Sequence, residues 1–173
     1  MILLKGVTKQ YSDAIEPALK GIDLEVNENE VFGLLGPNGA GKTTIISILC
    51  GMIAQSSGVA QIQGKDIREN LHWLKQLIGV VPQDIALYPT LSAKENLYYI
   101  GSMYGLEKQE LKVKINHWLE VFDLSDHANK RVERFSGGMK RKVNLIAGIL
   151  HQPKLLFLDE PTVGIEKDVK NKF

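Results

Sequence analysis

The chain has 173 residues, of which 44% are hydrophobic and 24% charged, a composition typical of a globular domain that buries its own core. Its 21 Lys and Arg residues balance 20 Asp and Glu residues, so its charge gives no reason to expect nucleic acid as the main partner. Its one cysteine, Cys50, has no partner for an internal disulfide, which fits a reducing compartment. No apolar run approaches the roughly 20 residues that cross a bilayer. We therefore expect a cytoplasmic location.

The first part of the chain is predicted to contain mostly strands, with one helix. Ile22–Val26 and Val59–Gln63 alternate apolar and polar residues, as half-buried strands do. Val31–Leu35 is a short apolar run before a glycine-rich loop, which predicts a fully buried strand. The residues of Lys42–Gly51 are expected to be helical, with an apolar face made by Ile45, Ile48, Leu49 and Met52.

From Ser92 onwards the pattern becomes helical. Ser92 followed by Glu95 is a capping-box signature for one helix, and a second helix is predicted over Lys108–Phe122. A third helix is expected to begin after Ser136-Gly137-Gly138. The chain thus reads as an α/β core interrupted by a helical insertion. Two apolar runs flank this region and are expected to be buried strands, Ile78–Val81 and Leu155–Leu158.

The glycine-rich loop has the spacing G-x-x-x-x-G-K-[ST] and lies between a predicted strand and a predicted helix. Its glycines let successive backbone N–H groups turn toward an anion, and the following helix directs its positive dipole end to the same place. Lys42 is suited to bridging β- and γ-phosphate oxygens, and the Thr43 hydroxyl to binding Mg²⁺. The alternative is a glycine-rich turn with an incidental lysine. The residues expected to contact a nucleotide are Gly36, Pro37, Asn38, Gly39, Ala40, Gly41, Lys42, Thr43 and Thr44.

Two acids, Asp159 and Glu160, directly follow the apolar run Leu155–Leu158. Parallel sheets bind ligands at the carboxyl ends of their strands, so both acids would face the phosphate site if this strand neighbours Val31–Leu35. Asp159 is suited to holding Mg²⁺ through a water, and Glu160 to polarising the water that attacks the γ-phosphate. The alternative is a helix N-terminus that carries acids. The phosphate loop upstream favours the catalytic interpretation.

A third motif is Phe135-Ser136-Gly137-Gly138-Met139, which alone would be typical of a helix N-cap. Together with the phosphate loop and the acidic pair, it makes the chain resemble the nucleotide-binding domain of ABC transporters, from near residue 1 to about residue 166. The family's signature loop L-S-G-G-Q reads F-S-G-G-M here, with Met139 in place of the usual Gln. The resemblance implies a P-loop NTPase core with a mostly parallel sheet, an N-terminal antiparallel β subdomain and an inserted helical subdomain. These would form one ABC ATPase domain over residues 1–173, with the helical subdomain at 84–150.

Further site residues follow from this resemblance. Ser136, Gly137 and Gly138 would contact the ATP held by a second copy, because two such domains face each other head to tail. Gln83, in Val81-Pro82-Gln83, would contact Mg²⁺ and sense the membrane partner, although a polar loop residue is the plain alternative. Tyr11 lies where the family places an aromatic ring on adenine, and a core tyrosine competes with this interpretation. The implied catalytic residues are Glu160, Lys42 and Gln83, and the implied Mg²⁺ ligands are Thr43, Gln83 and Asp159.

The implied function is an ATPase subunit, with ATP and Mg²⁺, similar to those of bacterial multidrug or antibiotic exporters. The similarity to exporters rests on residues 84–97 and on the Gly-Met-Lys-Arg-Lys run. The chain would form a homodimer or a heterodimer with a second ABC ATPase domain, beneath membrane-spanning permease subunits on the inner face of the membrane.

Two alternatives stay open. One is a soluble ABC ATPase that acts on nucleic acid or the ribosome, although the stretch from Lys42 to Ser136 is too short for a long coiled-coil insertion. The other is a module that binds ATP without hydrolysing it. This second alternative is supported because no histidine after the acidic pair matches the family's switch histidine, as expected of a chain that lacks the C-terminal part of the domain. The presence of Lys42, Gln83, Asp159 and Glu160 argues against it.

Overall fold

The computed structural model describes residues 1–158, which divide into two compact units. The first unit is Met1–Lys75, and the second begins at Gln76. The boundary falls inside helix α2 (Leu71–Leu77). Among the residues described, no helix is both long enough and apolar enough to cross a membrane.

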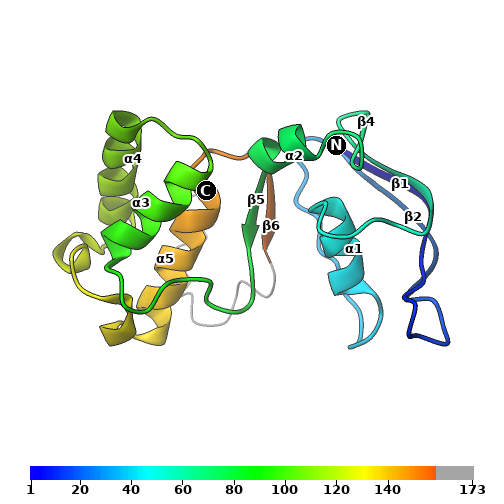
Figure 1. Ribbon diagram of the computed structural model, residues 1–173, viewed down its shortest axis with the longest axis horizontal. Helices are drawn as coiled ribbons and strands as arrows, with labels where there is room; N and C mark the ends of the chain where they lie inside the picture. Colours follow the sequence, from blue (N-terminus) through cyan, green and yellow to red (C-terminus); the bar gives the residue numbers. More distant parts are fainter. Residues whose placement is uncertain (159–173) are drawn as a thin grey trace. The chain divides into compact units, whose positions relative to one another are not determined.

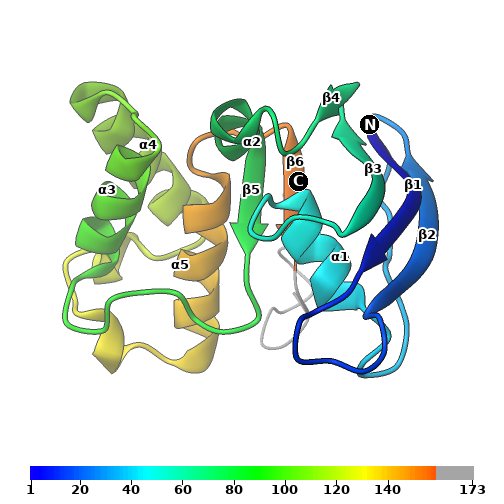
Figure 2. The same cartoon turned by 45° about the vertical axis from the view of Figure 1, so that its right-hand side comes forward.

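The first unit contains a four-stranded antiparallel sheet in the order β2-β1-β3-β4, with α1 packed against β3 (Figure 2). The predicted alternation in Ile22–Val26 is confirmed, because Val26 is buried while Asp23 and Glu25 are exposed. The strand predicted over Val59–Gln63 is confirmed up to Ile62, as part of β3. The elements of this unit are β1 (Ile2–Lys9), β2 (Leu19–Val26), α1 (Lys42–Leu49), β3 (Ser57–Ile62) and β4 (Lys65–Asp66).

Helix α1 buries three of the four apolar side chains predicted for its inner face, those of Ile45, Ile48 and Leu49. The prediction for Met52 is wrong, since its side chain is 66% exposed. The helix ends at Leu49, and Gly51 then adopts a left-handed φ of 69°. A residue beyond such a turn no longer follows the helical period, so Met52 does not continue the buried face.

The predicted buried strand over Val31–Leu35 is also wrong. These residues form no strand, and the side chains of Val31 and Leu35 are almost fully exposed. An apolar run becomes a buried strand only where neighbouring strands pair with its backbone and other elements cover its faces. None of the described strands pairs with this run, which explains why its side chains are exposed.

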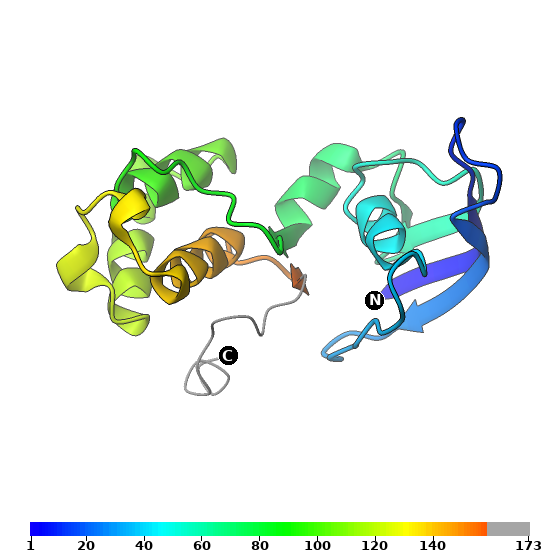
Figure 3. The same ribbon diagram turned by 90° about the horizontal axis from the view of Figure 1, so that it is seen from below.

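The second unit combines a two-stranded parallel sheet with helices α3, α4 and α5, which pack on one another (Figures 1 and 3). Helix α5 also contacts β5, so it joins the sheet to the other helices. The three helices start within two residues of the predicted positions, and α4 ends one residue before the predicted Phe122. The elements are β5 (Ile78–Val81), α3 (Ala93–Met103), α4 (Lys108–Val121), the 3₁₀ turns η1 (Ser125–His127) and η2 (Val132–Arg134), α5 (Gly137–Ile149) and β6 (Leu155–Leu158).

The core of the second unit lies between its helices. The predicted capping box starts α3: the Ser92 hydroxyl accepts from the Glu95 N–H at 3.2 Å, and the Glu95 carboxylate accepts from the Ser92 N–H at 2.8 Å. Every residue from Val143 to Leu150 is buried, which makes the second half of α5 the centre of this core. Its fully buried large side chains include Leu97, Leu111, Ile115, Leu119, Phe122 and Leu124.

Strand β6 forms where it was predicted, but it is less buried than expected. Its residues are mostly half-buried, and Leu158 is 41% exposed. It pairs with β5, joining Val81 to Leu158 at the last residue of each strand. Among the described strands, β5 is the one that pairs with β6, so one edge of β6 is covered and the strand is only partly shielded from solvent.

His151 follows α5, and its side chain is partly buried. Its Nε2 lies 2.9 Å from the Ile78 carbonyl oxygen, so Nε2 carries the proton and donates. Its ring stacks on Tyr104 with centroids 3.7 Å apart, and its buried Nδ1 has no hydrogen-bond partner among the described residues. Burial lowers the pKa of His151, more than the Ile78 hydrogen bond raises it.

The stability of the protein is consequently expected to depend on this histidine at acidic pH. A lowered pKa in the folded state means that the unfolded state binds more protons once the pH falls below about 6.5, so the free energy of unfolding decreases there. His151→Phe keeps the stacked ring and is expected to flatten that decrease in denaturant titrations between pH 7 and pH 5. His72→Phe, at an exposed position, is the control. Equal pH dependence in wild type and His151→Phe would contradict this assignment.

Candidate functional site

The phosphate-loop residues predicted from the sequence lie together at the start of α1. Gly41 is the N-cap of the helix, and its left-handed φ of 86° is a conformation that favours glycine. A Cβ atom there would come within 2.9 Å of the Ala18 carbonyl oxygen and closer still to Leu19. Any side chain at position 41 is therefore disfavoured, both by the backbone conformation and by the nearby Ala18 and Leu19.

The N-terminus of α1 is electrostatically open to an anion. No side chain caps the helix, and its first turn has no acidic residue. Helices α3 and α4 differ, because each carries an acid in its first turn, Glu95 in α3 and Glu110 in α4. An uncapped helix start leaves N–H groups and the positive end of the dipole available for a phosphate.

The Lys42 side chain folds back over the loop. Its ammonium donates to the carbonyl oxygens of Gly36 at 2.7 Å and Pro37 at 2.9 Å. Lys42 is half-buried, and Thr43 beside it is exposed. Both carbonyls belong to exposed residues, so the same ammonium can exchange them for phosphate oxygens without leaving buried acceptors unsatisfied.

Ser136 is the N-cap of α5, as the alternative interpretation of this motif predicts. Its hydroxyl accepts from the Met139 N–H at 3.2 Å, and Ser136 and Gly137 are exposed. The first turn of α5 has no acidic residue, as in α1. The cap and an anion contact are compatible, since the hydroxyl also has a proton to donate.

Gln83 lies two residues beyond β5 and is exposed. The backbone of its loop forms hydrogen bonds with side chains of α5. The Gln83 carbonyl oxygen accepts from Arg141 Nη1 at 2.5 Å. The sequence reasoning did not identify Arg141, or Asn144 one turn later, as part of this site. The sequence did contain a signal for them, because Arg141 and Asn144 lie at helical spacing from Leu145 and Gly148, on what is otherwise the apolar face of α5.

Tyr11 is 38% exposed, which excludes the interpretation that it is a core tyrosine. The Lys9 ammonium lies 5.2 Å from its ring centroid. An accessible aromatic face is what stacking on an adenine requires.

Asp159 and Glu160 lie outside the described residues, so their predicted roles remain predictions. The strand that leads to them ends at Leu158, paired with the last residue of β5. In the described part of the chain, no three His, Cys, Asp or Glu side chains cluster as a metal site would require. The assignment of Thr43, Gln83 and Asp159 as Mg²⁺ ligands therefore stays a prediction.

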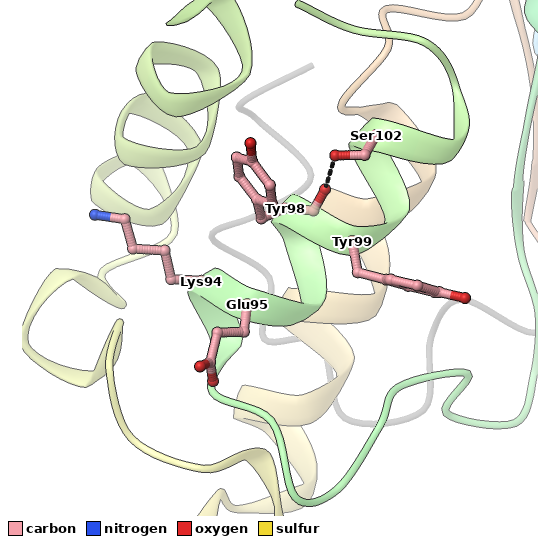
Figure 4. A pocket seen from close by; sticks show the side chains of 5 residues that line it. All are labelled: Lys94, Glu95, Tyr98, Tyr99 and Ser102. Atoms are coloured by element: carbon pink, nitrogen blue, oxygen red, sulfur yellow. Dashed lines mark hydrogen bonds between the residues drawn. The ribbon is translucent and has the colours of Figure 1, made fainter. Parts of the chain in front are cut away.

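A separate hollow lies on the outer face of α3 (Figure 4). The Ser102 hydroxyl donates to the Tyr98 carbonyl at 2.7 Å, and the Tyr99 ring contacts Tyr88 edge-on with centroids 5.2 Å apart. None of its residues is predicted to bind nucleotide. The hollow is lined by Lys94, Glu95, Tyr98, Tyr99 and Ser102.

Known proteins resemble this chain along almost its whole length. The family model described as ABC transporter matches residues 19–163. The linearmycin resistance ATP-binding protein LnrL of Bacillus subtilis is 45% identical over 171 residues, which cover 99% of this chain and 54% of that protein. The daunorubicin resistance ATP-binding protein DrrA3 of Streptomyces coeruleorubidus is 37% identical over 165 residues, covering 95% of this chain and 52% of that one. The chain spans about half the length of these relatives.

A solved structure of a dimeric ATP-binding cassette, in a post-hydrolysis state with ADP and Pi, has a similar fold. Its TM-score is 0.85 at 27% identity, over 99% of this chain and 79% of that one. The predicted fold class, α/β with a P-loop NTPase core, is thereby confirmed. Because the family model covers most of the chain, the chain belongs to the ABC transporter family and carries the ATP-binding domain of that family.

Proposed function

We propose that this chain binds Mg·ATP, hydrolyses it as one half of a dimer and powers export through membrane-spanning partner subunits. The observation that carries the proposal is the start of α1. There, a left-handed Gly41, an uncapped helix end and the Lys42 ammonium converge on one loop. The helix end and the ammonium both favour an anion such as a polyphosphate over a neutral ligand, and the left-handed Gly41 lets the chain turn into the helix at this point.

The residues present fit both ATP and Mg²⁺. Thr43, Gln83 and Asp159 offer a hydroxyl, an amide carbonyl and a carboxylate, and Mg²⁺ prefers such oxygen ligands. The pairing of Val81 with Leu158 supports a shared site, because the chain enters the Gln83 loop and the acidic pair from adjacent strand ends. Bound Mg²⁺ would neutralise charge on the phosphate oxygens.

Catalysis is assigned to this chain's own side chains. The Lys42 ammonium would hold the phosphate oxygens and offset the charge that develops on them. Glu160 would orient the attacking water and polarise it as a general base. Gln83 would connect the metal site with the helical region that follows it in the chain.

The dimer is proposed from the start of α5. Ser136, Gly137 and Gly138 would contact the ATP held by a second ABC ATPase domain, identical or different. The exposure of Ser136 and Gly137 and the absence of an acid from the first turn of α5 support this role. The solved relative with ADP and Pi is described as dimeric.

Export through membrane subunits is proposed from the relatives, two of which are named for resistance to linearmycin and daunorubicin. The exposed aromatic face of α3, with Tyr98 and Tyr99, supports a protein partner there, because aromatic residues are enriched at interfaces (Figure 4). The balanced charge gives no support to nucleic acid as a ligand. The protein would act at the cytoplasmic face of the membrane.

Cys50 provides a test of ATP binding. It is buried at the end of α1, and burial raises the pKa of its thiol to about 12. A thiol reagent at neutral pH is therefore expected to react only with opened molecules. Mg·ATP that binds the folded state should slow labelling by about 100-fold at 100 times its Kd. Adenosine, which lacks the phosphates, should give far less protection.

Phosphate release measured in the same titration separates the remaining possibilities. Release that rises faster than linearly with protein concentration is expected for a dimeric ATPase. Protection without release would instead identify a module that binds ATP and does not hydrolyse it. Absence of protection at millimolar Mg·ATP would contradict the proposed function.

A further inference from the structure

The loop that carries Gln83 has no helix or strand, yet buried side chains of α5 hold its backbone. Arg141 is 5% exposed, and its Nη1 donates to the Pro82 carbonyl at 3.0 Å as well as to that of Gln83. Asn144 is 3% exposed; its Nδ2 donates to the Pro82 carbonyl at 3.3 Å, and its Oδ1 accepts from the Ala86 N–H at 3.2 Å. Two adjacent turns of α5 thus bind the first part of the loop.

The far end of the loop is held separately, by α3. Asn96 is completely buried; its Oδ1 accepts from the Tyr88 N–H at 2.7 Å, and its Nδ2 donates to the Tyr88 carbonyl at 3.0 Å. Because the Asn96 side chain bonds to the backbone of Tyr88, Leu91 and Ser92, loss of the α5 hydrogen bonds would release the first part of the loop while the second part stays attached.

One of the two α5 side chains that hold the loop carries a positive charge. Hydrogen bonds from a charged guanidinium are shorter and stronger than those between neutral groups, and a low-dielectric surrounding strengthens them further. Arg141 lies five residues after Ser136, in the second turn of the same helix. The first part of the Gln83 loop and the start of α5 are therefore tied together.

We propose that Arg141 and Asn144 are positioning residues for Gln83. They make the start of α5, with its cap Ser136, and the Gln83 backbone move as one body. A movement of α5 caused by a phosphate contact at Ser136 is then transmitted directly to the Gln83 backbone, without involving the rest of the helical region. The inference rests on the proposed function, in which Gln83 contacts the Mg²⁺ of bound ATP.

Amide hydrogen exchange tests the anchor itself. In Arg141→Met and Asn144→Leu, the amides of residues 83–87 should exchange at least about tenfold faster, while those of α3 keep their wild-type rates. Lys142→Met is the matched control, because Lys142 Nζ donates to the Phe122 carbonyl at 3.1 Å, away from the loop. If Arg141→Met does not fold, Arg141→Lys keeps a buried cation and is expected to show a smaller increase. Unchanged exchange in Asn144→Leu and in whichever Arg141 variant folds overturns the anchor.

The Mg²⁺ dependence of ATP affinity tests the positioning role. The gain in affinity on adding Mg²⁺ should fall about 10- to 100-fold in Arg141→Met, as loss of an outer contact to a metal ligand does. Affinity without Mg²⁺ should be unchanged. In a Gln83→Ala background, Arg141→Met should have no further effect, since both substitutions then remove the same interaction.

The outcomes separate the anchor, the positioning role and the proposed function. Faster exchange with an unchanged Mg²⁺ gain overturns positioning, as does a full additional loss in the Gln83→Ala background. ATP binding by the wild type, read from Cys50 protection, tests the proposed function independently of these variants. A wild type that binds no ATP overturns the proposed function, and the positioning role with it.

Discussion

Replacing Glu160 by Gln is expected to abolish ATP turnover while leaving ATP binding intact. Glu160 follows the end of β6, next to the predicted metal ligand Asp159, and is assigned as the base that polarises the attacking water. Gln keeps the size of the side chain and removes its basicity. Loss of a general base slows turnover by about 10²- to 10⁴-fold. Phosphate release and Cys50 protection, measured on the same sample, would separate turnover from binding.

A matched control makes this result specific to the position. Glu120→Gln carries the same chemical change at an exposed position on α4 and should release phosphate at the wild-type rate. Wild-type turnover in Glu160→Gln would remove Glu160 from the mechanism and leave the assignment of the base to another group. Loss of Cys50 protection in Glu160→Gln would indicate instead that the substitution damages the fold.

Where the sequence pattern is local, it predicted the fold well. The capping box at Ser92 and Glu95 depends on two residues three apart, and the N-cap at Ser136 on one hydroxyl. The phosphate-loop spacing likewise fixes a glycine N-cap and a lysine at the start of α1. These features are set by the backbone and its nearest side chains, so they can be read without knowledge of tertiary contacts.

Where burial depends on distant neighbours, the sequence was a poorer guide. Val31–Leu35 is apolar enough for a buried strand, but no described strand pairs with it. Leu155–Leu158 forms a strand whose described partner is β5. Which strands pair depends on the tertiary structure, and the sequence of a single apolar run does not predict its partner.

The same reason explains why Arg141 and Asn144 were missed as site residues. Their hydrogen bonds reach the loop after β5, roughly 60 positions away in the chain. A charged side chain on a helix is usually solvated, so Arg141 in a basic run reads as part of the surface. Only the position of Arg141 on the buried face of α5 indicates that its guanidinium needs hydrogen-bond acceptors within the protein.

Lys42→Met is expected to weaken ATP binding by roughly 10- to 150-fold. The substitution keeps the apolar stem and removes the ammonium, and a hydrogen bond to a charged group contributes about 1.5–3 kcal/mol. Without nucleotide, that ammonium is bound to the carbonyls of Gly36 and Pro37, which belong to exposed residues and can bond to water instead. The free energy of unfolding should therefore change by no more than about 0.5 kcal/mol.

The comparison with Lys20→Met decides whether charge in general or this ammonium in particular is responsible. Lys20 lies in the same unit, pairs with Glu16 at 2.6 Å and has a side chain that is 65% exposed. Its removal lowers the net charge by the same amount, so a long-range attraction for ATP would weaken equally in both variants and would be screened by salt. A contact made by Lys42 predicts instead that only Lys42→Met loses Cys50 protection and that the loss persists at high salt. Equal ATP affinities in the two variants would exclude Lys42 from the phosphate site. If Lys42→Met does not fold, the hydrogen bonds from Lys42 to the Gly36 and Pro37 carbonyls stabilise the free protein more than the exposure of these residues indicates.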